Sequence, residues 1–255
     1  MTLLEELVTF FKSIFHWFCY FVFFSIIFFS FGLGHVTLFG KNYLLPLLST
    51  HSFSVQIFNF MRQTVLPPEV ELITSNPLSA FVSQILLSLL LSFFLTIPLF
   101  LYEIIAYINP ALLPHEKRVV AASLIPLVLL FFAGCAFSYF YLIPTTFDVL
   151  YPFATAMGAS PLFEVNEFIQ YVFGLMVGVG IMFLLPLFMI LLSYLRIIKS
   201  EFWLSKWRFA LVLFLILSAI ITPDGTGVTM GMLFVPLTGL YFAGYYFAKR
   251  CERSG

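Results

Sequence analysis

The carboxylates most suited to chemistry lie in two places, each beside a long apolar run. Glu5 and Glu6 precede the first run, and Glu116 stands directly before Lys117 and Arg118, just ahead of a later one. A carboxylate on a rigid segment beside a bilayer can receive a guanidinium, because the two groups form parallel charge-assisted hydrogen bonds. A simpler interpretation is that Glu116 only neutralises its two basic neighbours, and spacing alone favours it.

The segment that positions Glu116, residues 102–118, also contains Glu103 and several residues that restrict the backbone. Asn109-Pro110 and Pro114 predict a defined, non-helical path for this segment, because proline and the residue before it disfavour helix. A rigid path would hold Glu116 in one place.

No other pattern in the sequence indicates a catalytic, metal or cofactor site. The apolar runs have no acidic or basic residue near their centres, and neither an HExxH motif nor a pair of intramembrane aspartates is present. Cys19, Cys135 and Cys251 form no CxxC pair, so no zinc site is indicated. We therefore expect neither an enzyme nor a protein with a metal or other cofactor.

The composition places these elements in a membrane. Of 255 residues, 62% are apolar and only 9% are charged, whereas a soluble domain carries about 25% charged residues. These values exclude an ordinary cytosolic enzyme and a disordered chain. The formal net charge is zero, which argues against nucleic acid as a partner.

The runs without Asp, Glu, Lys or Arg locate the membrane spans, since about 20 apolar residues in a helix cross the hydrocarbon core. They predict an all-α integral membrane protein of one domain, residues 1–255, with six transmembrane helices. The approximate spans are 13–35, 77–104, 119–143, 167–194, 209–223 and 228–247.

The fifth predicted span is short. Its uncharged run, 209–223, lies between Arg208 and Asp224 and gives a helix of roughly 22 Å, against a hydrocarbon core of about 30 Å. Such a mismatch is relieved by local thinning of the bilayer or by packing against longer helices. The sixth span is also shortened, so the bundle would end in two short helices.

The basic residues orient the chain. With the amino terminus in the cytoplasm, only Lys41 and Arg62 fall outside. By the positive-inside rule this bias predicts that both termini are cytoplasmic. The inner basic residues are Lys12, Lys117, Arg118, Arg196, Lys199, Lys206, Arg208, Lys249, Arg250 and Arg253.

The long first outer segment contains its own helix signal. In residues 53–65, apolar Val55, Phe58, Met61 and Val65 recur at helical spacing. This pattern predicts a short amphipathic helix at the membrane surface.

Prolines inside the predicted spans indicate kinked helices, because each removes one backbone hydrogen bond. They are Pro98, Pro126, Pro186 and Pro236. Kinked helices can form a concave, glove-like bundle. The alternative is that these prolines are merely tolerated, as is common in membrane helices.

Several ordered motifs resemble those of one family. Residues 96–120, TIPLFLYEIIAYINPALLPHEKRVV, and 134–150, GCAFSYFYLIPTTFDVL, resemble the second span, first cytoplasmic loop and third span of the TatC family, the polytopic subunit of the twin-arginine protein translocase. ITSNPLSAF (73–81) is similar to the family's entry into the second span, and TPDG (222–225) to its last outer turn. The resemblance covers nearly the whole chain.

The resemblance implies a function and a set of partners. TatC proteins recognise twin-arginine signal peptides of folded cargo proteins, work with single-span TatA/TatB-type subunits, and depend on the proton-motive force. It further implies self-association and a multi-pass location in the cytoplasmic membrane of a prokaryote, or alternatively in a mitochondrial or plastid membrane.

The resemblance also assigns roles to residues. Glu116 matches the loop carboxylate that contacts the signal-peptide arginines, and Glu6, before Leu7, matches the acid of an N-terminal glutamate–leucine motif. The residues expected to shape the loop are Tyr107, Pro110 and Leu112. The matches on the outer side are Asp224, an acidic position linked to partner-dependent function, and Pro46, Pro77 and Phe81, which hold the cap.

The chain departs from the family pattern at three places. Val8-Thr9-Phe10 stands where an arginine usually follows the N-terminal motif, and Glu103 stands where the family often has Gln. Leu184 occupies a position that is Glu or Gln in many members. The role of that polar side chain is therefore either taken by Gln170 or another polar residue, or it is dispensable here.

Two other functions remain open at this point. A small-solute transporter or channel subunit is compatible with six spans, interior prolines and the GLMVGVG run (174–180), but it should show broken helices or a polar midplane site. A structural subunit of a larger membrane complex is compatible with the lack of buried charge.

Overall fold

The computed structural model describes residues 3–38, 41–48, 52–67, 70–108, 114–158, 162–222 and 227–254. The chain divides into two compact units. The first comprises Met1–Pro110 with Leu162–Tyr171, and the second comprises Ala111–Pro161 with Val172–Gly255. Each unit is built mainly from apolar helices, as the composition predicts.

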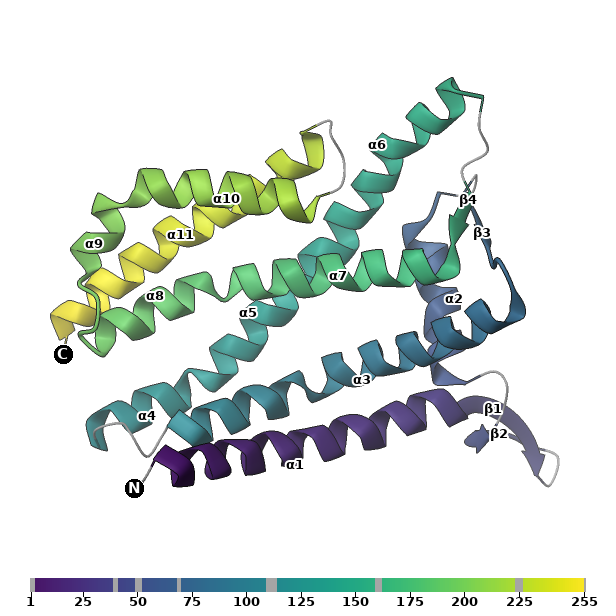
Figure 1. Cartoon of the computed structure of the whole chain (residues 1–255), viewed down its shortest axis with the longest axis horizontal. Coiled ribbons are helices and arrows are strands. Elements are labelled where there is room, and N and C mark those ends of the chain that lie inside the picture. The colour runs from purple at the N-terminus through teal and green to yellow at the C-terminus, as the bar shows by residue number, and fades with distance from the viewer. Residues whose placement is uncertain are drawn as a thin grey trace. The chain divides into compact units, whose positions relative to one another are not determined.

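The first unit is built around two long helices. Helix α1, Leu3–Ser30, lies alongside α3, Pro77–Ile108, and the two run in opposite directions (Figure 1). The aromatic ring of Trp17 in α1 lies 4.8 Å from that of Phe100 in α3. One turn further along α1, the backbone carbonyl of Phe21 accepts a 2.5 Å hydrogen bond from Ser92 of α3. These contacts fix how α1 lies along α3.

The amphipathic helix predicted at 53–65 is confirmed. Helix α2 spans Phe53–Val65, and Met61 and Val65 on its apolar side are buried. The phenyl ring of Phe58 packs edge-on against that of Phe168, with 6.1 Å between ring centroids. Helix α2 is therefore held against the start of α7, Val165–Phe183.

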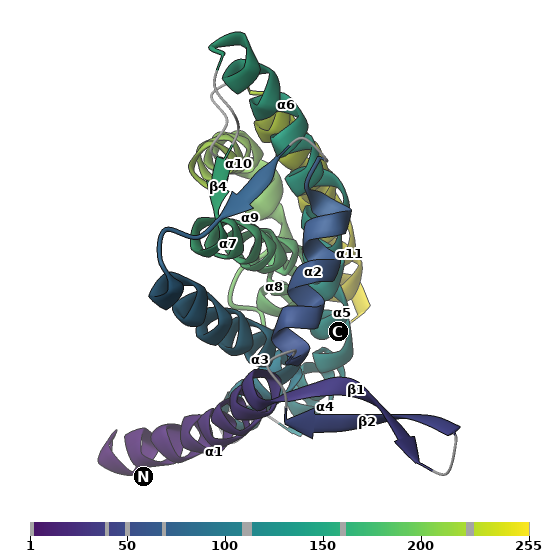
Figure 2. The same ribbon diagram turned by 90° about the vertical axis from the view of Figure 1, so that its right-hand side faces the viewer.

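Extended structure replaces helix after Ser30, where the predicted first span continued to residue 35. Strand β1, Phe31–Leu38, pairs antiparallel with β2, Lys41–Leu48, and this hairpin follows α1 directly (Figure 2). A second, parallel pair joins β3, Glu71–Ile73, to β4, Leu162–Glu164. Gly32 and Gly34 disfavour helix, which explains the early end of α1.

The prediction of a non-helical path through 102–118 is wrong at both ends. Helix α3 continues to Ile108, and α4, Pro114–Ala122, begins at the second proline. Residues 102–108 contain no helix breaker, and a proline in the first turn of a helix loses no intrahelical hydrogen bond. Helices α3 and α4 therefore flank the Asn109-Pro110 step in the sequence, and this step itself lies outside the described residues.

The second unit consists of helices, most of them interrupted. Its elements are α4, α5 (Leu124–Phe137), a π-helical turn (Ser138–Leu142), α6 (Ile143–Ala156), the larger part of α7, α8 (Leu185–Tyr194), α9 (Ser200–Ser205), α10 (Trp207–Ile221) and α11 (Val228–Ser254).

Proline accounts for the interruptions. Pro126 lies just after the break at Ser123, and Pro186 just after the break at Leu184. Each proline lacks the N–H that would bond the carbonyl four residues earlier, so the preceding turn loosens. Pro98 and Pro236, by contrast, lie inside continuous helices α3 and α11.

Small residues allow close helix packing in the second unit. A Cβ atom added to Gly134 of α5 would lie 2.9 Å from the Cα of Gly180 in α7, and one added to Gly244 of α11 would lie 2.8 Å from the Cα of Pro186 in α8. A Cβ atom added to Gly174, in the same GLMVGVG run as Gly180, would meet nothing within 4 Å. The run therefore supplies a packing surface at its end but not at its beginning.

Polar contacts tie α9 to α8 and to α11. The Trp203 indole N–H donates to the Ser193 hydroxyl at 3.1 Å, and the Tyr241 hydroxyl donates to the Trp203 carbonyl at 2.5 Å. The carboxylate of Glu252 accepts a 3.0 Å hydrogen bond from the N–H of Ser200, the first residue of α9. A distant acidic side chain thus satisfies one of the free donors of this helix terminus.

The described residues contain five helical stretches long and apolar enough to cross a membrane. They are Phe11–Ser30, Pro77–Ile108, Lys117–Ala156, Val165–Tyr194 and Val228–Glu252. The fifth predicted span corresponds to α10, a shorter apolar helix. A membrane protein made of helices is therefore confirmed, and a count of six spans stays a prediction.

The glycine contacts make a direct prediction. We expect Gly134→Ala and Gly244→Ala to lower the apparent melting temperature in detergent, because each methyl group meets backbone atoms and overpacking costs about 1–3 kcal/mol. Gly174→Ala is the matched control and should not lower it, because alanine favours helix by about 1 kcal/mol over glycine. Equal melting temperatures for all three variants would contradict the close packing.

Candidate functional site

A cavity with several polar side chains in its lining opens between the first half of α1 and the end of α3. Its volume is about 400 Å³. Its lining residues are Lys12, Ser13 and His16 from α1, and Tyr102, Glu103 and Ala106 from α3. Because α1 and α3 are antiparallel, residues some 90 positions apart in the sequence meet here.

Glu103 is the acidic group of this cavity. The Ser13 hydroxyl donates a 2.5 Å hydrogen bond to Oε2 of Glu103. An ionised carboxylate has about four lone-pair sites on its two oxygens, so one hydrogen bond leaves most of its acceptor capacity for another group. The site thus presents a positioned carboxylate that is only half-buried.

Two further titratable groups of the cavity, Lys12 and His16, lie one turn apart on α1. Nδ1 of His16 lies 2.8 Å from the carbonyl oxygen of Lys12. A carbonyl oxygen can only accept, so Nδ1 is the donor in this contact. Together with the Lys12 ammonium, the cavity can therefore bind groups of either charge.

The sequence-predicted inner residues belong to both units. Glu6 lies in α1, which also carries the cavity, and half-buried Tyr107 lies in the last turn of α3. Glu116 lies in α4, in the other unit. The side chains of Glu6 and Glu116, and all of Pro110 and Leu112, lie outside the part of the chain that the structure describes.

The predicted outer residues are partly described. Pro77 begins α3, and the ring of Phe81 packs edge-on against that of Phe29, with 5.8 Å between centroids. This contact joins the C-terminal end of α1 to the N-terminal end of α3. Pro46 lies in β2 with its side chain undescribed, and Asp224 lies outside the described residues.

Leu184 stands at the break between α7 and α8. Its side chain is buried, and its N–H donates to the carbonyl of Ile181 at 3.1 Å. Gln170, which the sequence offered as a substitute polar group, is exposed in α7. The position at which the resemblance predicts a polar group is thus filled by a packed apolar side chain.

The chain matches the family model described as "Sec-independent protein translocase protein (TatC)" over residues 4–236. The chain therefore belongs to the TatC family. The resemblance expected from the sequence motifs is confirmed, and with it the function of a protein translocase component in a membrane.

Relatives from archaea, bacteria and chloroplasts share this similarity. A TatC protein of the archaeon Cenarchaeum symbiosum is 38% identical over 80% of this TatC-family chain and 77% of its own length. One of Aquifex aeolicus is 32% identical over 79% and 84%, and a chloroplastic one of Arabidopsis thaliana is 30% identical over 81% and 61%.

Solved structures give the same result. A crystal structure of the twin-arginine translocase receptor TatC aligns with a TM-score of 0.74 and 28% identity, over 96% of this TatC-family chain and 99% of the other. A second crystal structure of that receptor, in a detergent, aligns with a TM-score of 0.75.

The Ser13–Glu103 contact can be tested apart from transport. Ser13→Ala should destabilise the purified protein by about 1 kcal/mol, the usual net value of one hydrogen bond. Glu103→Gln should cost less, because the carboxamide oxygen can still accept from Ser13. Thermal melting of Ser13→Ala, Glu103→Ala and the double variant measures the coupling, because both of these substitutions remove the contact. Strictly additive effects would show that the two side chains do not interact.

Proposed function

We propose that this chain is the receptor subunit of a twin-arginine translocase, and that it binds the twin-arginine signal peptides of folded cargo proteins. The alignment with the solved twin-arginine translocase receptor over 96% of the chain carries the proposal. The carboxylates on and next to α1, α3 and α4 supply the chemistry: Glu6, Glu116 and Glu103.

Recognition would rest on pairing between carboxylate and guanidinium. The two arginines of the peptide would approach Glu116 and Glu6, with Tyr107, Pro110 and Leu112 shaping the segment between α3 and α4. A fully exposed ion pair contributes about 0–1 kcal/mol, whereas truncating one partner of a shielded pair costs a few kcal/mol. Selectivity for arginine over lysine follows because only guanidinium binds a carboxylate in a bidentate manner.

The cavity beside Glu103 supports a peptide site on the α1–α3 pair. Glu6 precedes Ser13 by seven residues on α1, a rise of roughly 10 Å. A peptide bound at Glu6 could therefore reach the open face of the Glu103 carboxylate. The apolar part of the signal peptide would then follow the exposed apolar surface of the spans.

We further propose the remaining parts of the machinery. The chain works as one membrane domain without catalytic groups, together with single-span subunits of the TatA/TatB type, and transport draws on the proton-motive force. The match to the solved translocase receptor supports a non-catalytic role. On the outer side, contacts with partner subunits would involve Asp224, and the cap would be held by Pro46, Pro77 and Phe81.

Glu116→Gln tests the receptor role. We expect it to weaken photocrosslinking to a twin-arginine signal peptide by at least about tenfold, the effect of losing one charge-assisted pair. Crosslinking to the twin-lysine version should change much less. Glu201→Gln, which removes an exposed carboxylate from α9, is the matched control. If Glu116→Gln and Glu201→Gln bind both peptides alike, Glu116 has no part in recognition.

The proposed topology has a separate test. With six spans and both termini cytoplasmic, alkaline phosphatase fused after residue 255 should be inactive, and phosphatase fused after residue 158 should be active, because the enzyme folds only outside the cytoplasm. Activity of the C-terminal fusion would exclude this topology.

A further inference from the structure

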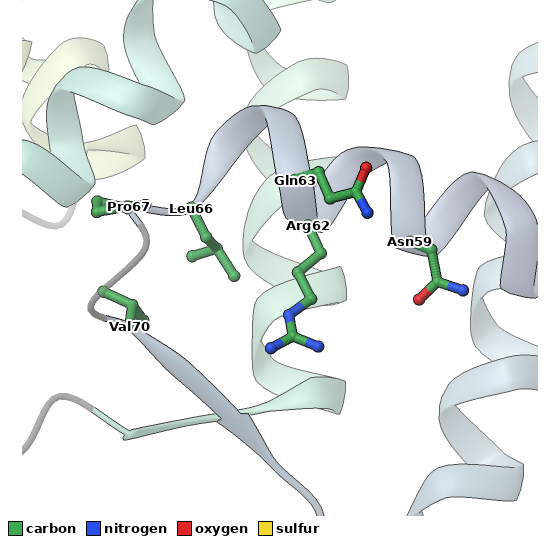
Figure 3. A pocket seen from close by; sticks show the side chains of 6 residues that line it. All are labelled: Asn59, Arg62, Gln63, Leu66, Pro67 and Val70. Atoms are coloured by element: carbon green, nitrogen blue, oxygen red, sulfur yellow. The ribbon is translucent and has the colours of Figure 1, made fainter.

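A second polar pocket lies on the first unit, at the C-terminal end of α2. It has a volume of about 390 Å³ and is lined by Asn59, Arg62, Gln63, Leu66, Pro67 and Val70 (Figure 3). The resemblance to the TatC family assigned no role to these residues, and none of them lines the cavity of Glu103.

Arg62 gives the pocket its charge. Its guanidinium is exposed and makes no hydrogen bond or ion pair with any residue the structure describes. The carboxylate of Glu164, in β4, instead accepts a 3.1 Å hydrogen bond from Ser75. Arg62 lies in the last turn of α2, where the helix dipole favours a cation, so the end of the helix itself stabilises its charge.

The remaining lining residues divide into a polar and an apolar side. The side chains of Asn59, Arg62 and Gln63 project from the same stretch of α2, while Leu66, Pro67 and Val70 form the opposite edge (Figure 3). Leu66 and Val70 are largely buried, so neighbouring residues hold their side chains in place at the apolar edge of the pocket. A guanidinium on the same helix as two carboxamides suits an oxyanion, and the apolar edge suits an aliphatic group attached to it.

The surroundings indicate that this oxyanion belongs to a lipid. Phe60, two residues before Arg62, exposes 64% of its surface, and Leu78 in the first turn of α3 exposes 68%. A helix that carries an arginine beside an exposed aromatic residue is typical of the membrane interface. A strand of three residues, β3, joins the pocket to the turn before α3, so the pocket lies close in the chain to the start of a predicted span.

We propose that this pocket binds the phosphate of a glycerophospholipid headgroup. Arg62 pairs with the phosphate oxygens, Asn59 and Gln63 donate further hydrogen bonds, and the glycerol and first methylene groups contact Leu66, Pro67 and Val70. Bound lipid would anchor α2 at the interface. This inference does not depend on the signal-peptide site.

The test uses the purified full-length chain in a phosphate-free maltoside detergent. The probes are dihexanoyl-phosphatidylglycerol, dihexanoylglycerol, which lacks phosphate, and inorganic phosphate, with apparent Kd as the readout. Arg62→Gln should weaken binding of the phospholipid by at least about tenfold, and Arg62→Lys by less. Dihexanoylglycerol should bind no better to the wild-type chain than to Arg62→Gln.

Matched variants keep the result interpretable. Arg208→Gln removes an exposed arginine that stacks on Trp207 at 5.6 Å in the other unit, and it should leave the Kd unchanged. Glu69→Gln removes an acid next to Val70 that lies outside the described residues, and it should not weaken binding. Gln63→Glu places a carboxylate next to Arg62 in the sequence and should weaken phospholipid binding. This variant keeps the proposal testable even if Arg62→Gln folds poorly.

Three outcomes would overturn the proposal. One is equal affinity of wild type, Arg62→Gln and Gln63→Glu for the phospholipid. Another is equal affinity for dihexanoylglycerol and the phospholipid, which would make the site apolar. The last is inorganic phosphate binding as tightly as the phospholipid, which would make the pocket a site for the free ion.

Discussion

A bilayer offers no water to unpaired peptide groups, and this constraint governs the fold. Each unsatisfied backbone group in hydrocarbon costs several kcal/mol, so a spanning chain must satisfy its hydrogen bonds within helices. Two buried threonines meet the same requirement by bonding to carbonyls one turn earlier: Thr96 donates to Ser92 and Thr146 to Leu142, both at 2.8 Å. Polar residues can thus lie in apolar helices without any tertiary partner.

The same constraint explains which parts of the fold could be predicted. Periodicity identified α2 to the residue, because an amphipathic helix leaves a local pattern. Charge-free runs located the apolar helices but did not distinguish helix from strand, so the end of α1 at Ser30 was missed. The local signal there was Gly32 and Gly34, followed by β-branched Val36 and Thr37.

The candidate site was predictable only in part. Residue type and position beside apolar runs drew attention to Glu6 and Glu116, but only the likeness to a family motif assigned them a role, and that role stays a prediction. Glu103 was noticed as a departure, but its pairing with Ser13 depends on how α1 lies along α3, and this follows from contacts such as Trp17 with Phe100. Contacts between residues so far apart in sequence leave no periodic signal. Parallel pairing of β3 with β4 was missed for the same reason.

The crossing of α5 and α7 at Gly134 and Gly180 restricts how this sequence can diverge. Atoms of each helix occupy the space where a side chain of the other would stand. The Cβ of Phe183, for example, would lie 2.9 Å from a Cβ added to Gly134. A larger residue on either helix is therefore tolerated only after such a neighbour is replaced by a smaller residue or adopts another rotamer. Descendants of this chain should therefore change these positions together, and an ancestor can be reconstructed only if they are treated as one unit.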